Sequence, residues 1–237
     1  MSIRKKDIKN QLLACMGTHD FDALAPHLDP VDLPRSFVIS HPDTVIEHYY
    51  FIEAGLGSIV CVSQDGFRAE VGMVGKDGVI PVAAIFDRDS SAHQIVMQVG
   101  GHGHRIDSAV FKEIMGGSET MRRLLLRFAS NLSTQASYTA LSNAVHHVEE
   151  RLARWLLMCH DRIGDEKLKL THEYLAVLLA VRRPSVTTAL HILEGNRFIY
   201  ATRGLITIRD REGLQRFAAD AYGVPEAEYR ALFGPLP

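Results

Sequence analysis

Residues 170–208 constrain the fold most strongly, because they read as two short helices joined by a tight turn and followed by two strands. Thr171 is a good N-cap for the first helix. Pro184 suits the first position of the second helix, where its missing N–H costs nothing. Apolar residues recur at helical spacing in both segments. The pattern predicts a helix-turn-helix with a two-stranded wing over residues 198–201 and 205–208.

The charge of this stretch separates it from the rest of the chain. From Arg182 to Arg211 there are six arginines and two acidic residues, a local net charge of +4, whereas the whole chain carries −2. A basic patch confined to the second helix and the wing is typical of a protein that binds duplex DNA. An ordinary pair of packed helices is the commoner structure, but it gives no reason for such a patch, so we favour DNA binding.

Polar residues at the start of the second helix are the candidates for reading DNA. They lie off the apolar stripe and can reach base edges and phosphates. These residues are Arg182, Arg183, Ser185, Thr187 and Thr188. Thr171, at the start of the first helix, and Arg203, in the wing turn, are candidates for phosphate contacts.

The composition bounds the remaining possibilities. An apolar content of 46% in 237 residues supports full-sized cores. Cys15, Cys61 and Cys159 lie far apart without a C-x-x-C pair, which favours reduced, buried thiols in a cytoplasmic protein. No signal peptide is expected, and no apolar run reaches the roughly 18 residues of a membrane span.

The first half of the chain changes from helical to β-rich patterns. Short helices are expected at residues 3–15 and 20–28. Short strands separated by Gly/Asp turns are expected at residues 36–39, 45–52, 57–62, 69–74, 94–99 and 104–106. Many short strands at this spacing predict a compact antiparallel barrel or sandwich. The apolar segment 79–86 is compatible with either a short helix or a turn.

A long helix of roughly 39 Å is expected over residues 118–143. Met121, Leu125, Phe128 and Leu132 recur in it at the spacing of a two-heptad seam. The helix either lies on its own barrel or forms the seam of a symmetric dimer. We favour the dimer, because two helix-turn-helix units then read two half-sites about one helical turn apart.

These patterns predict an α+β chain in three parts. Residues 1–110 form an antiparallel β-barrel, sensor-like domain with N-terminal helices, and residues 111–146 contain the long dimerisation helix. Residues 147–237 form a winged helix-turn-helix DNA-binding domain.

The sequence resembles the Crp/Fnr family of bacterial transcription regulators over essentially its full length. The most specific matches are V-E-E-R-L-A-R-W-L-L at residues 148–157 and V-R-R-P-S-V-T at residues 181–187. The resemblance implies a jelly roll like a cyclic-nucleotide-binding domain and a homodimer that binds a palindromic operator to regulate transcription, with RNA polymerase as a partner. By motif position, Arg183 and Ser185 fall where family members contact bases. Pro184 and Thr188 depart from the glutamate and arginine found there, so the best-known half-sites are not assumed.

The sensor half departs further from the family pattern. Cyclic-nucleotide binders carry a G-E pair followed by R-S-A, whose arginine pairs with the cyclic phosphate. Here Ser91-Ala92 matches, but Ser90 stands at the arginine position and Ile80 at the glutamate position. A phosphate buried without its cation is strongly disfavoured. We therefore expect no response to cyclic AMP. The β domain binds either an unidentified small molecule or none, in which case regulation comes from the abundance of the protein alone.

Other sensing and catalytic functions are weaker alternatives. Three cysteines cannot supply the four thiolates of an iron–sulfur cluster. His102, His104 and the pair at residues 146–147 could hold a metal or haem iron, and Cys61 or Cys159 could be a redox switch, but spacing closes no ligand set.

A metal-dependent barrel enzyme is a further alternative, and an interaction role for the C-terminal module is another. No catalytic constellation stands out, and the arginine-rich face argues against the interaction role. We therefore expect neither an enzyme nor a resident cofactor or metal.

Overall fold

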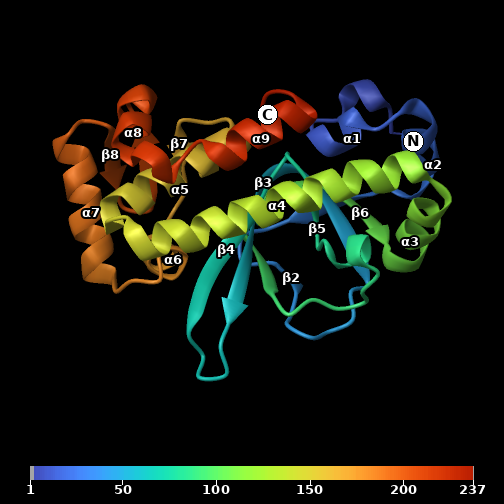
Figure 1. The fold of residues 1–237 in the computed structure, drawn as a ribbon, viewed down its shortest axis with the longest axis horizontal. Helices are drawn as coiled ribbons and strands as arrows, with labels where there is room; N and C mark the ends of the chain where they lie inside the picture. The colour runs from blue at the N-terminus through green and yellow to red at the C-terminus, as the bar shows by residue number, and fades with distance from the viewer. Residues whose placement is uncertain (1–2, 237) are drawn as a thin grey trace.

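A computed structural model describes residues 3–236. It places an N-terminal β domain and a C-terminal helical domain along one long helix (Figure 1). The C-terminal domain, which contains the helix-turn-helix and the wing, is called the reader. The chain begins with 3-10 turns and two short helices, α1 (Gln11–Cys15) and α2 (Thr18–Leu24). Asn10 caps α1 by accepting from the Leu13 N–H, and its Nδ2 donates to the carbonyl oxygens of Ile52 and Gly78. The N-terminal helices are thereby fixed to the sheet.

Six strands form one antiparallel sheet in the order β1-β6-β3-β4, with β2 paired to β6 and β5 to β3. The strands are β1 (Asp29–Leu33), β2 (Val38–Ser40), β3 (His48–Val62), β4 (Arg68–Val74), β5 (Val79–Ile80) and β6 (Gln94–Asp107). The predicted antiparallel β domain is confirmed. Over residues 3–236 the sheet is open rather than closed into a barrel, since β1 and β4 end the order unpaired with each other.

Two strands are longer than predicted, because the expected turns are irregularities within them. The runs predicted at residues 45–52 and 57–62 join in β3, and those at 94–99 and 104–106 join in β6. The register between β3 and β6 shifts around Ala54. Gly101 permits this close crossing, because a Cβ there would lie 1.8 Å from the Ala54 carbonyl oxygen.

The long helix predicted for residues 118–143 is α4 (Glu119–Val145), capped by Ser118, whose side chain accepts from the Met121 N–H. The other helices are α3 (Ser108–Gly117), α5 (Val148–Ile163), α6 (His172–Leu178), α7 (Arg183–Gly195), α8 (Arg211–Ala218) and α9 (Val224–Phe233). The apolar segment 79–86, for which the sequence allows either a short helix or a turn, contains β5 and a 3-10 turn (Ala83–Phe86). Within the described chain, no single helix is long and apolar enough to span a membrane. Only α6 and α7 taken together reach that length and apolarity, and the two helices are bent by 101° relative to each other.

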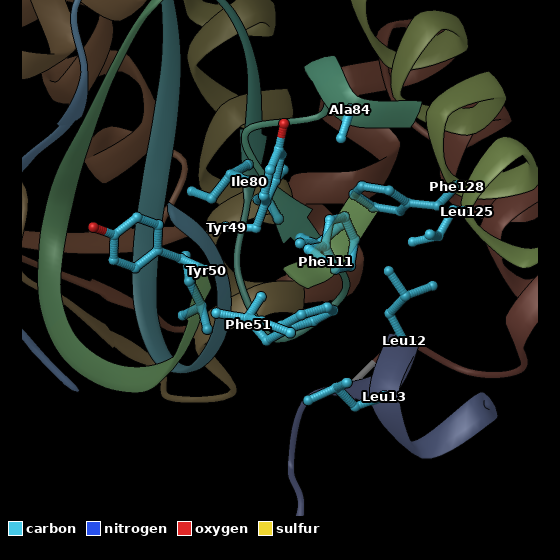
Figure 2. Packing of buried hydrophobic residues seen from close by; sticks show 14 of the residues in the cluster. Leu12, Leu13, Tyr49, Tyr50, Phe51, Ile80, Ala84, Phe111, Leu125 and Phe128 are labelled. Atoms are coloured by element: carbon cyan, nitrogen blue, oxygen red, sulfur yellow. The ribbon is translucent and has the colours of Figure 1, made fainter. Parts of the chain in front are cut away.

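The inner face of α4 belongs to the core of the β domain. Met121, Leu125 and Phe128 are 0%, 0% and 2% exposed and lie in the cluster formed with the sheet and the N-terminal helices. Figure 2 shows Leu125 and Phe128 projecting from α4 towards Phe111. Side chains buried within one protomer cannot contact a second, so their assignment to a dimer seam is wrong. The same 4-3-4 spacing serves either role, and the sequence does not distinguish them.

The fourth residue of that proposed seam, Leu132, is half-buried and packs against the same core. It lines a hollow between α4 and the sheet together with Ile59 and Val71. Leu132 therefore faces the β domain as well, and any partner surface of α4 must lie on the opposite face.

A second core holds α5, the helix-turn-helix and the wing, together with Leu56 and Met73 from the sheet. Helix α9 does not join it, since Tyr229 and Phe233 pack into the core of the β domain. The Tyr229 hydroxyl donates to the Asp77 carbonyl oxygen at 2.7 Å. The C-terminal helix thus runs back along α4 (Figure 1). This arrangement differs from the expected assignment of all of residues 147–237 to the reader.

Candidate nucleic-acid interface

Helices α6 and α7 form the predicted helix-turn-helix. Their axes differ by 101°, within the range of this motif. Thr171 caps α6, because its Oγ1 accepts from the Tyr174 N–H at 3.3 Å. The chain turns through Ala180, whose φ is +50°, and Pro184 lies in the first turn of α7. Both sequence signals used to place these helices are therefore present in the structure.

One side of α7 is buried and the other faces solvent. Its buried residues are Val186, Ala189, Leu190 and Leu193. Of the predicted reading residues, Arg182, Arg183 and Thr188 are exposed, whereas Ser185 and Thr187 are half-buried. The exposed side of α7 is thus free to approach a duplex.

Four of the seven predicted residues surround one hollow of about 510 Å³. It lies between the start of α6, the face of α7 and the wing turn, and its lining includes Thr171, Arg183, Thr187 and Arg203. The Thr187 hydroxyl donates to the Arg183 carbonyl oxygen at 3.3 Å, so it is already engaged within the helix. The hollow brings together two arginines that can each pair with a phosphate or a base edge.

The other three predicted residues lie outside this hollow. Arg182 lines a different groove, between the β3–β4 hairpin and the helix-turn-helix, with Phe67 and Val181. The Thr188 hydroxyl donates to the Pro184 carbonyl oxygen at 3.2 Å. The structure therefore does not gather the seven residues into one site.

Sequence reasoning missed two histidines and two acids that line the hollow, His172, His191, Glu173 and Glu194. His191 is exposed and follows Thr187 by one helical turn. The i, i+4 spacing from Arg183 through Thr187 was the signal that could have found it. Glu194 has a structural task, since its Oε1 accepts from the Ala201 N–H of the wing at 2.8 Å.

The wing consists of β8 (Ile199–Thr202) and β9 (Leu205–Ile208), and β9 also pairs with β7 (Lys167–Leu168). Gly204 supplies the left-handed turn residue, with φ of +75°. Arg203 is exposed at this turn. The predicted wing is confirmed, although its first strand begins one residue later than expected.

Fewer arginines are free to bind DNA than the six counted in the sequence between Arg182 and Arg211. Arg211 Nη2 lies 2.5 Å from Asp161 Oδ1 and 3.1 Å from the Tyr222 hydroxyl oxygen, and Asp161 is buried. This arginine holds α8 to α5 and is not free to bind DNA. Arg209 lies over the Tyr200 ring at 5.3 Å from its centroid, a cation–π contact that leaves the guanidinium at the surface.

A buried carboxyl joins the reader to the β domain. Glu70 on β4 is 1% exposed, and its Oε2 accepts from the Ser58 hydroxyl and, at 2.8 Å, from the Tyr174 hydroxyl of α6. Burial raises the pKa of Glu70 to about 8, against the lowering effect of these hydrogen bonds and of Arg162 and Arg154. The carboxyl is therefore largely protonated at neutral pH and bridges the two parts without a buried anion.

The geometry gives little support to a metal-binding or a redox-sensing role. Among residues 3–236, no three His, Cys, Asp or Glu side chains gather as a possible metal site. Burial raises the pKa of the Cys159 thiol far above its ordinary value, so this thiol stays protonated. Cys15 and Cys61 are exposed, which corrects the expectation of three buried thiols.

Comparisons with known proteins place the reader and the fold. Residues 150–217 match the family described as "Crp-like helix-turn-helix domain". No curated protein matches the chain. The fold resembles that of FixK2 from Bradyrhizobium japonicum, with a TM-score of 0.70 and 16% identity over 81% of this chain and 98% of that one.

Two further structures show the same fold. A Crp/Fnr-family transcriptional regulator from Thermus thermophilus has a TM-score of 0.64 and 19% identity over 80% of this chain and 98% of its own. The c-di-GMP responsive global regulator CLP from Xanthomonas campestris has a TM-score of 0.64 and 15% identity over 81% and 99%. The family resemblance and the fold expected from the sequence are confirmed.

Proposed function

We propose that this chain, a Crp/Fnr-type transcription regulator with a helix-turn-helix DNA-binding domain, works as a homodimer on a palindromic operator. In this proposal the exposed side of α7 enters the major groove and the wing follows the adjacent backbone. The observation that carries it is the hollow shared by Arg183 of α7 and Arg203 of the wing, beside a buried apolar stripe that fixes α7.

The proposed contacts divide by chemistry. Arg183 is exposed in the first turn of α7 and supplies the bidentate donor that reads guanine. Arg182, Ser185, Thr187 and Thr188 complete the reading edge. The remaining residues, Thr171 and Arg203, contact phosphates and set the register of the protein on the duplex.

Dimerisation is proposed through the outward face of α4. Leu126 and Leu141 are 45% and 48% exposed there, and both belong to a stripe that continues through Ser133 and Ser137. Small side chains between two exposed leucines let two helices approach closely. Two copies joined along α4 would present two readers to the two halves of an operator.

We further propose that cyclic AMP is not the effector. Ile80 is fully buried in the core. The lining of the hollow between α4 and the sheet includes neither Ser90, at the arginine position of the family, nor Arg88, the arginine two residues before it. The cyclic phosphate would therefore lack its cation there. The resemblance adds RNA polymerase as a partner, with the protein acting on DNA in the cytoplasm and not as an enzyme.

The reading assignments are tested by fluorescence anisotropy on an operator obtained by selection and on a duplex with one changed base pair. Arg183→Ala should lose about 1–3 kcal/mol of binding free energy on the operator and discriminate less against the changed duplex. Arg203→Ala should weaken both duplexes alike and lower the salt dependence by about one phosphate contact. Arg230→Ala on α9, also exposed, is the matched control and should bind normally. Equal losses on both duplexes for Arg183→Ala and Arg203→Ala would contradict the assignments.

A further inference from the structure

The chain after the wing leaves the reader and returns to the β domain. Helix α8 belongs to the reader, because its Leu214 and Ala218 are fully buried in the reader core. Helix α9 belongs to the β domain, because its Tyr229 and Phe233 pack into the core there. Residues 211–233, here named the α8–α9 strap, therefore join the two cores. Helix α9 lies beyond the part of the chain that matches the Crp-like helix-turn-helix domain.

The first half of the strap is held on the reader and at the break between α4 and α5. The Tyr222 hydroxyl donates to Asp161 Oδ2 of α5 at 2.6 Å. The 3-10 turn between α8 and α9 (Ala219–Ala221) places Asp220 Oδ1 at 3.0 Å from His146 Nε2. Because His146 is the C-cap of α4, the strap contacts the chain where the long helix ends and the reader begins.

The second half of the strap is held on α4 and on α1. Asn131 Nδ2 of α4 donates to the Pro225 carbonyl oxygen at 2.8 Å. Gln11 Nε2 of α1 donates to the Phe233 carbonyl oxygen at 3.2 Å. The side chains of Tyr229 and Phe233 are buried between these two contacts. Apolar burial and hydrogen bonds at both ends of α9 thus hold it against the β domain.

Asp77, in the turn between β4 and β5, contacts both the strap and the reader. Its carbonyl oxygen accepts from the Tyr229 hydroxyl at 2.7 Å, and its Oδ2 lies 2.8 Å from Arg162 Nε of α5. Both side chains of this ion pair are 3% exposed. Removing either partner would leave an uncompensated buried charge, so the pair is hard to separate. The strap and α5 are therefore fixed to the same turn of the β domain.

The strap leaves the DNA-reading surface open. Of the described residues 211–233, none lines the hollow shared by Arg183 and Arg203. Figure 1 shows α9 alongside α4 and away from α7. An effect of the strap on DNA binding must therefore come from where it holds the reader, because the strap itself does not border the proposed interface.

We propose that the α8–α9 strap is a specificity-determining element that sets the spacing between the two half-sites of the operator. The inference rests on the proposed function, because it requires a dimer with two readers. Successive base pairs of a duplex are about 3.4 Å apart and rotated by about 35°. Two readers held rigidly on their β domains therefore engage both half-sites at one spacing only. Two inserted base pairs turn the second half-site by about 70° and remove it from the second reader.

Tyr229 and Phe233 act as positioning residues in this proposal. A reader released from the strap stays tethered through the break between α4 and α5 and reaches half-sites at several spacings. Binding two half-sites at once raises affinity by about 100-fold or more, and the gain is lost when the geometry forbids simultaneous contact. Release of the strap should therefore weaken the preference for one spacing while leaving each reader's own contacts intact.

Fluorescence anisotropy on three duplexes tests this role: the selected operator, the same operator with two base pairs inserted between its half-sites, and a single half-site. The wild-type protein should prefer the operator over the inserted duplex by about 100-fold. In a double variant, Tyr229→Ala with Phe233→Ala, that preference should fall to about tenfold or less, with half-site affinity unchanged. Arg230→Ala, exposed on the same helix, is the matched control and should keep the wild-type preference.

A milder variant and a second readout do not depend on the folding of the double variant. Tyr229→Phe keeps the packing and removes only the hydroxyl that donates to Asp77, so it should lower the spacing preference by about threefold. NMR relaxation of the protein without DNA reports how the two parts move. Amides of the reader and of the β domain should tumble together in the wild type, whereas those of the reader should tumble faster in the double variant.

The outcomes separate the strap from the proposed function. An unchanged spacing preference in both strap variants, or joint tumbling of the two parts in the double variant, would overturn the proposal. Equal losses on all three duplexes would also overturn it, because they would show that the strap only supports the folding of the reader. A folded wild-type protein that binds no duplex would refute the proposed function and the spacing role with it, and the tumbling of the DNA-free protein would still decide whether the strap fixes the reader.

Discussion

Replacing Glu70 by glutamine tests the link between the β domain and the reader. Glutamine has nearly the shape of the protonated carboxyl and keeps an oxygen that accepts from Ser58 and Tyr174. It does not titrate. Because the pKa of Glu70 rises from the ordinary 4.5 to about 8, the native protein binds a proton that the unfolded chain releases between those two values.

Because the native protein binds this proton more tightly than the unfolded chain does, its stability falls as the pH rises. The stabilising effect of the bound proton is fully present below pH 4.5 and is lost as the pH rises through about 8. In that window the free energy of unfolding should fall by about 1.4 kcal/mol per pH unit relative to Glu70→Gln. Between roughly pH 5 and pH 8 the difference between the two proteins should change by about 3–4 kcal/mol.

Urea denaturation followed by tryptophan fluorescence measures this difference. Trp155 is the only tryptophan of the chain, is 1% exposed and lies in the core of the reader. Glu212→Gln, at an exposed carboxylate on α8, is the matched control and should keep the wild-type pH profile. Parallel profiles for wild type and Glu70→Gln would refute the proton-binding role of this carboxyl.

Three further predictions concern stability and assembly. Leu125→Ala should lower the free energy of unfolding by about 2–5 kcal/mol in urea denaturation, because its side chain is fully buried; wild-type stability would contradict the core assignment. Leu141→Glu should give folded monomers by analytical ultracentrifugation with lost operator affinity, and intact dimers would place the interface elsewhere. Gly101→Ala should destabilise the sheet, because its Cβ would overlap the Ala54 carbonyl; an unchanged thermal transition would refute the close crossing.

Local sequence signals located the reader well. Thr171, Pro184 and Gly204 each have one favoured structural position, and the structure has all three there. The long helix was equally predictable, since its cap at Ser118 and its periodic apolar residues agree. These features depend on interactions between residues close in sequence, which a pattern records directly.

Tertiary placement was not predictable in the same way. The 4-3-4 spacing of Met121, Leu125 and Phe128 defines one apolar face but not which surface covers it. The turn-like residues around Gly55 and Gly101 mark a close crossing of two long strands, which only their pairing partner reveals. Long-range contacts also decide the roles of Arg211 and Glu70, because Asp161 and Tyr174 lie far away in sequence.

Selection of bound duplexes from a random pool, with purified protein and no added ligand, tests the central claim that the protein is a dimeric reader of symmetric DNA. The wild-type protein should enrich a palindrome whose half-sites are about one helical turn apart. Arg183→Ala should enrich a sequence degenerate at one position of each half-site. Enrichment of single, unpaired sites would contradict the dimer, and no enrichment from a folded protein would contradict sequence-specific DNA binding itself.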